Sequence, residues 1–78
     1  MEIREKIGNR IKALRELKSM SQKDLAYESD LDRSYIASVE SGQRNISIVN
    51  IEKIANALKV SLQEFFKDNV FEELTKDI

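Results

Sequence analysis

Apolar side chains recur at steps of three and four residues along most of this 78-residue chain. That spacing is typical of helices that bury one face, and no stretch shows the strict alternation of a strand. The pattern predicts five helices, at about residues 2–18, 22–29, 33–41, 48–58 and 61–78. The predicted fold class is therefore all-α, a compact five-helix bundle that forms a single domain over residues 1–78.

Polar residues mark where these helices begin and end. Ser21, Asp32 and Ser47 each precede a predicted helix, where a side-chain oxygen can accept a hydrogen bond from a first-turn N–H group. Asp24 can reach back to Ser21 in a variant of the capping box. Gly42 can adopt the positive φ that follows a last helical turn. These signals predict short helices joined by tight polar turns.

The most informative stretch is residues 21–41, where two short predicted helices are separated by about three turn residues. Its apolar positions form the expected skeleton of a helix-turn-helix, and they are Leu25, Ala26, Leu31, Ile36 and Val39. The outer face of the second helix is short, polar and free of acidic residues, and it carries Arg33, Ser34, Ala37 and Ser38 beside Tyr35. This face is a candidate recognition surface.

Composition removes most enzyme chemistry from consideration. The chain contains no histidine and no cysteine, so it lacks the commonest general base, the thiolate nucleophile and the usual zinc ligands. We therefore expect no catalytic activity, no metal and no cofactor. The mixed charges of residues 1–6 predict no signal peptide, and the frequent charges predict no membrane span, so we expect a cytoplasmic protein.

The segment Gln22–Ala26 carries the pattern Q-x-x-L-A. The pattern I-x-x-[VL]-E-x-G begins at Ile36 and ends with the segment Val39–Gly42. With Leu31 between them, they resemble the helix-turn-helix of the phage repressor and Cro type. The similarity extends over about residues 4–66. It implies a lambda-repressor-like DNA-binding domain.

Two shorter segments, Leu31–Ile36 and Arg44–Ile48, are more narrowly similar to the controller proteins of restriction–modification systems. That resemblance implies a homodimer on double-stranded DNA, in which the third helices enter successive major grooves of a pseudo-palindromic operator. It implies a regulator that activates the endonuclease gene and represses its own, with RNA polymerase as a further partner. Two alternatives stay open: a phage-type repressor, and an antitoxin or another protein-binding module.

Eight residues are candidates for DNA contact: Ser21, Gln22, Arg33, Ser34, Tyr35, Ser38, Arg44 and Asn45. The guanidinium fork of Arg33, at the start of the recognition helix, can meet O6 and N7 of guanine. The hydroxyl groups of that helix can reach phosphates or base edges. The first two candidates lie at a helix N-terminus, which favours a phosphate, and the last two lie in the loop beside the recognition helix.

Some of these side chains also have a structural interpretation. Arg33 could pair with Asp32 or Glu40 on the surface, and Tyr35 could lie at the edge of the core with its hydroxyl in water. Asp30 stands where many helix-turn-helix proteins have glycine, so we expect it in the left-handed region, which Asp tolerates. Asp30 and Asp32 are both expected to turn toward helix caps.

The last predicted helix carries more apolar surface than a small domain can bury alone. We expect self-association through it, with a dimer interface formed by Leu62, Phe65, Phe66, Val70, Phe71 and Leu74. A single core below about 80 residues rarely supplies more than about 3–5 kcal/mol, which also favours a partner subunit.

The formal net charge of -1 hides an uneven distribution. Residues 4–23 hold seven basic and two acidic side chains, whereas residues 45–78 hold four basic and six acidic ones. This asymmetry predicts a cationic surface from the N-terminal part, able to steer a polyanion, and a more acidic dimer end.

Overall fold

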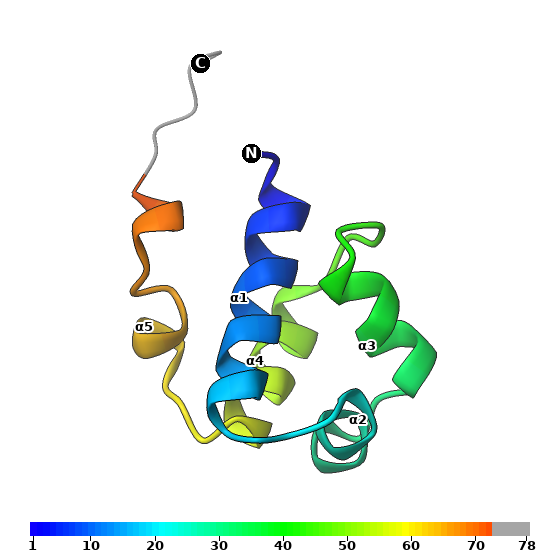
Figure 1. Ribbon diagram of the computed structural model, residues 1–78. Coiled ribbons are helices and arrows are strands. Elements are labelled where there is room, and N and C mark those ends of the chain that lie inside the picture. Colours follow the sequence, from blue (N-terminus) through cyan, green and yellow to red (C-terminus); the bar gives the residue numbers. More distant parts are fainter. Residues whose placement is uncertain (73–78) are drawn as a thin grey trace.

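The computed structural model describes residues 1–72, and every regular element in that range is helical. In chain order the elements are α1 (Ile3–Leu17), α2 (Gln22–Ser29), α3 (Arg33–Glu40), α4 (Ile48–Ala57), α5 (Leu62–Phe65) and the 3-10 turn η1 (Asn69–Phe71). The predicted all-α class and the first four predicted helices are confirmed. Figure 1 shows α1 in the middle of the molecule, with α2 and α3 on one side and α5 on the other. None of these helices is long and apolar enough to cross a membrane.

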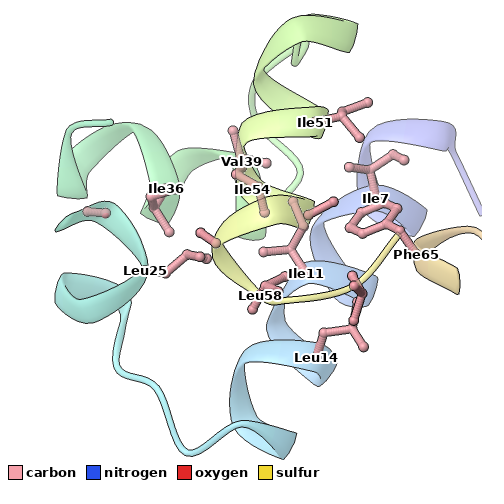
Figure 2. Packing of buried hydrophobic residues seen from close by; sticks show 14 residues of the cluster. Ile7, Ile11, Leu14, Leu25, Ile36, Val39, Ile51, Ile54, Leu58 and Phe65 are labelled. Carbon is pink, nitrogen blue, oxygen red and sulfur yellow. The ribbon is translucent and has the colours of Figure 1, made fainter. Parts of the chain in front are cut away.

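One hydrophobic cluster holds the helices together. Six of its side chains are 0% exposed, and they are Ile11, Leu25, Ile36, Ile54, Leu58 and Phe65. Each of the five helices contributes at least one of them, and Figure 2 shows their side chains converging between the ribbons. The prediction that Phe65 lies at a dimer interface is wrong, because its ring is the largest fully buried side chain of this core.

Side-chain caps begin α2 and α4 as predicted. The Ser21 hydroxyl accepts from the Asp24 N–H (2.9 Å), and the Asp24 carboxylate accepts from the Ser21 N–H (3.0 Å), which completes the predicted capping box. The backbone N–H and the hydroxyl of Ser21 lower the pKa of Asp24 because they stabilise its charged form. Ser47 accepts from the Asn50 N–H (3.1 Å). Asp32 takes the N-cap position of α3 without a side-chain cap bond, so the predicted cap bond is wrong; its exposed carboxylate stays in water.

Tight turns in this chain rely on left-handed backbone. Asp30 has φ 58° and Gly42 has φ 78°, which confirms both predictions. Asp30 caps the end of α2 through its backbone, whose N–H donates to the Tyr27 carbonyl (3.3 Å). Ser19 (φ 56°) and Lys59 (φ 62°) adopt the same conformation after α1 and α4, where the sequence carries no glycine to signal it.

The long helix predicted from residue 61 is wrong over the described residues. α5 ends after four residues, and η1 begins after a break of three. Leu74, predicted at the dimer interface, lies outside the described residues.

Arg10 occupies the acceptors that a longer α5 would need. Its Nε donates to the Phe65 carbonyl (2.7 Å), and its Nη2 donates to the carbonyls of Glu64 (2.9 Å) and Lys67 (3.4 Å). In a continuing helix these oxygens would accept from N–H groups four residues later. Arg10 also forms an ion pair with Asp68 (3.4 Å). A cation from α1 therefore fixes where α5 stops.

Gly8 lies where α1 comes closest to the end of α3. A Cβ atom at this position would lie 2.4 Å from the Val39 carbonyl oxygen and 2.7 Å from that of Glu40. Both neighbours are backbone atoms, which cannot rotate away as a flexible side chain can. Only glycine fits here without a shift of one helix against the other.

Replacement of Gly8 by alanine should therefore destabilise the protein. In an open helix position the same change would stabilise by about 1 kcal/mol, but overpacking a close contact costs about 1–3 kcal/mol. We expect Gly8→Ala to lower the free energy of unfolding in urea, while Lys12→Ala on the exposed face of α1 changes it by less than about 0.5 kcal/mol. A Gly8→Ala protein more stable than the parent would contradict this packing.

Candidate nucleic-acid interface

A buried ion pair positions the two helices of the helix-turn-helix. Arg15 Nε donates to Glu40 Oε2 (2.8 Å) and Arg15 Nη2 donates to Glu40 Oε1 (3.0 Å), with side chains only 11% and 4% exposed. Arg15 Nη1 donates to the Met20 carbonyl (2.8 Å), and Gln22 Nε2 donates to Glu40 Oε1 (3.1 Å). The hydrogen bond to Glu40 raises the pKa of Arg15. These bonds connect α1, the turn after it, α2 and the last turn of α3.

Arg33 lies on the outer face of α3 and is exposed, as is its neighbour Ser34. The predicted alternative, in which Arg33 pairs with Asp32 or Glu40, is wrong: Glu40 is already bound to Arg15, and Arg33 has no ion pair among residues 1–72. The planar guanidinium therefore presents its N–H groups to solvent at the first turn of α3. Such a fork can bind two acceptors on one base edge.

A cluster of four side chains joins α3 to the loop and helix that follow it. The guanidinium carbon of Arg44 lies 5.0 Å from the centre of the Tyr35 ring, and Arg44 Nε donates to the Ser38 hydroxyl (3.0 Å). Asn50 Nδ2 donates to the Tyr35 hydroxyl (3.0 Å). Tyr35 is half-buried at the core edge, as one interpretation predicted, but a side chain and not only water holds its hydroxyl. Asn50 was not a candidate, because no local pattern places it beside α3.

Ser21 and Gln22 lie at the start of α2, where the sequence predicted phosphate contacts. The Ser21 hydroxyl already caps α2. The Gln22 amide donates to buried Glu40, which fixes its orientation and leaves the second of its two N–H groups for another acceptor. Asn45 is exposed in the loop after α3 and is therefore also accessible.

The positive charges of α1 do not form one cationic surface as predicted. Arg15 is buried against Glu40, and Arg10 is bound to Asp68 and to carbonyls near the end of α5. The charge surplus of residues 4–23 is partly internal, so the predicted steering surface is weaker than the count of charges suggests.

The remaining candidates for the dimer interface lie near α5. Leu62, Val70 and Phe71 are half-buried, and Leu62 and Phe71 pack against the core. Phe66 is 40% exposed, and its ring makes edge contacts with Phe65 (centroids 5.0 Å apart) and Phe71 (5.1 Å). Among these residues, Phe66 presents an exposed apolar surface.

Comparison with known proteins identifies the family. Residues 11–65 match the helix-turn-helix family. Control protein C.MunI from a Mycoplasma species is 46% identical over 68 residues, which cover 86% of this chain and 92% of that protein. This chain belongs to the restriction–modification controller family of helix-turn-helix proteins. Control protein C.BamHI from Bacillus amyloliquefaciens is also related, with 51% identity over 59 residues, covering 74% of this chain and 73% of that protein.

A solved controller structure has the same fold. Controller protein C.Esp1396I, solved as a tetramer in complex with its natural 35-base-pair operator, superimposes with a TM-score of 0.82 at 42% identity. The match covers 86% of this chain and 88% of that one. The resemblance drawn from the sequence and the fold it implies are therefore confirmed.

Loss of the Glu40 carboxylate should strongly destabilise the fold. Removing one member of a buried ion pair leaves the other charge without its partner, which costs about 3–5 kcal/mol. We expect this loss for Glu40→Ala in urea unfolding, and we expect Glu28→Ala on the exposed face of α2 to change the stability by less than about 0.5 kcal/mol. Equal stabilities of the two variants would show that the Arg15–Glu40 pair does not hold these helices.

Proposed function

We propose that this chain is a sequence-specific DNA-binding transcriptional regulator that controls a restriction–modification system. As a homodimer it binds a pseudo-palindromic operator in the cytoplasm, activates the endonuclease gene and represses its own. The observation that carries this proposal is the exposed Arg33 guanidinium, which has no ion pair among residues 1–72 and lies in the first turn of α3.

The dimensions and charge of α3 fit a major groove. A helix with its side chains is about 10–12 Å wide, and the major groove of B-DNA is about 12 Å wide. The one acidic residue within α3, Glu40, is buried at the end of the helix and neutralised by Arg15. The outer face therefore meets the negative potential of DNA with a cation and hydroxyl groups.

The cluster around Tyr35 supports a contact with the DNA backbone beside that groove. Asn50 fixes the Tyr35 hydroxyl, and the Tyr35 ring in turn lies against the Arg44 guanidinium. This leaves the Arg44 guanidinium close to Ser38, so both reach the same flank of the recognition helix. An arginine in this place supplies affinity that does not depend on sequence.

The likeness to controllers favours this function over a phage-type repressor. The match with C.MunI covers 92% of that protein, so the two chains correspond over nearly its whole length. The C.Esp1396I tetramer on its operator supports a multimer of this chain on DNA. Activation of the endonuclease gene would add RNA polymerase as a further partner. The proposed role is DNA binding without a catalytic step.

Removal of the Arg33 side chain should reduce the protein's preference for one DNA sequence over another. A bidentate contact to guanine contributes about 1–3 kcal/mol of discrimination against another base. We expect Arg33→Ala to lose that discrimination in titrations of a selected site and its single-base variants, whereas Lys67→Ala, beyond α5, leaves it unchanged. If Arg33→Ala changes neither preference nor affinity, a protein-binding module becomes the better assignment.

Arg44 should affect binding in a different way. As a phosphate contact, its loss should weaken binding to all sequences about equally and reduce the slope of log affinity against log salt by about one. We expect Arg44→Ala to give this result in titrations at several salt concentrations, with the order of preferred sites unchanged. A change of preferred base with an unaltered slope would instead assign Arg44 to base recognition.

A further inference from the structure

The N-cap of the recognition helix differs from the other N-caps of this protein. Within residues 1–72, the other N-cap side chains each accept a hydrogen bond from a first-turn N–H, and they are Glu2, Ser21, Ser47, Ser61 and Asp68. Asp32 holds the same position before α3, with extended backbone (φ -69°, ψ 143°), but its side chain makes no such bond. Its carbonyl does accept from the Ile36 N–H (3.1 Å), so the backbone is fixed while the carboxylate is not used by the helix.

The Asp32 carboxylate is exposed and has no bonded partner in the part of the chain that the structure describes. The adjacent Arg33 does not neutralise it, since the Arg33 guanidinium also has no ion pair among residues 1–72. The recognition helix therefore begins with two opposite charges at consecutive positions. Both are exposed to a ligand that approaches this end of α3.

The position of Asp32 brings its carboxylate to the bases when α3 enters a major groove. The N-terminal residues of a recognition helix are the ones that contact base edges, and Asp32 directly precedes them. The phosphates on both sides of the groove repel a carboxylate. A carboxylate accepts hydrogen bonds and donates none, so its favourable partners in the groove are the amino groups of cytosine (N4) and adenine (N6).

We propose that Asp32 is a second base-reading residue, which accepts a hydrogen bond from the amino group of a cytosine or an adenine beside the guanine bound by Arg33. This role of Asp32 rests on the proposed function and deepens it. A guanidinium selects acceptors, whereas a carboxylate selects a donor. In a G·C pair the acceptors O6 and N7 of guanine lie beside the N4 amino group of cytosine, so one base pair or two neighbouring pairs can bind both side chains.

The same carboxylate acts against other sequences. With guanine or thymine at its position, it faces an acceptor oxygen, O6 or O4, in place of an amino group. It then loses water without gaining a hydrogen bond, which is costly for a charged group. Asp32 therefore raises specificity by excluding sites, which is as effective as adding contacts to the preferred one.

Replacement of Asp32 by serine tests this role. Serine removes the charge and is a good N-cap, and its hydroxyl both donates and accepts, so it does not distinguish amino groups from oxygens. On single-base variants of a site that the parent selects from a random duplex pool, the parent should prefer cytosine or adenine about tenfold at one position of each half-site. Asp32→Ser should lower this preference to less than about threefold and keep the guanine preference of Arg33.

Asp30→Asn is the matched control. Asp30 is exposed in the turn just before α3, and asparagine tolerates its left-handed backbone. Both variants remove one negative charge, so both gain any general attraction to DNA, but Asp30→Asn should keep the base preference of the parent. If both variants lose the preference equally, the net charge accounts for the effect and the role of Asp32 is wrong. Thermal unfolding checks that both variants are folded, and we expect Asp32→Ser to be as stable as the parent.

A modified base tests the hydrogen bond itself. N4-methylcytosine still pairs with guanine, and N6-methyladenine with thymine, but the methyl group replaces the amino hydrogen that does not take part in pairing. At the position read by Asp32, this change should weaken binding of the parent about tenfold and binding of Asp32→Ser less than about threefold. Equal losses in the two proteins would overturn the proposal. So would a parent that is insensitive to methylation at every cytosine and adenine of its site, a result that needs no variant.

The results separate the failure of this role from the failure of the proposed function. A parent protein without sequence preference on any duplex refutes the proposed function, and the role of Asp32 with it. A parent that selects a site and loses its guanine preference in Arg33→Ala, but keeps its other preferences unchanged in Asp32→Ser, retains the proposed function. That second result overturns the role of Asp32 alone.

Discussion

The buried ion pair between Arg15 and Glu40 is the contact on which the helix-turn-helix depends. Burying two charges is costly, and the cost is recovered only when good geometry and further hydrogen bonds satisfy both groups. Here a two-pronged contact meets that condition, together with bonds to Met20 and Gln22. Because the four groups come from α1, the turn, α2 and α3, the pair sets the position of the recognition helix relative to the rest of the fold.

The arginines form two groups, according to whether the fold binds their charge inside the protein or leaves it at the surface. Arg10 and Arg15 act inside the protein, where one ends α5 and the other fixes α3. Arg33 is exposed in the first turn of the recognition helix, and Arg44 lies against the same helix, where it donates to Ser38. A net charge near zero is therefore compatible with binding a polyanion. The cations that the fold leaves without an ion pair determine the charge of the surface that meets DNA.

Local signals in the sequence predicted much of this arrangement. The capping box at Ser21 and the left-handed Asp30 involve neighbours within a few residues, so the sequence alone locates them. The early end of α5 was not predictable, because its cause is Arg10, more than fifty residues away. The same holds for Asn50, which reaches Tyr35 only after α4 packs beside α3. Apolar spacing indicates that Phe65 is buried, either in the core or at a subunit interface. Only the packing of the whole core decides between these two places.

The central claim is that the exposed face of α3 reads bases in a major groove. The most direct measurement is the affinity for a selected site in which single guanines are replaced by 7-deazaguanine, which lacks the N7 acceptor. We predict a loss of about tenfold at symmetry-related positions for the parent protein and none for Arg33→Ala. Unchanged affinity at every guanine, or the same losses in both proteins, would contradict the claim.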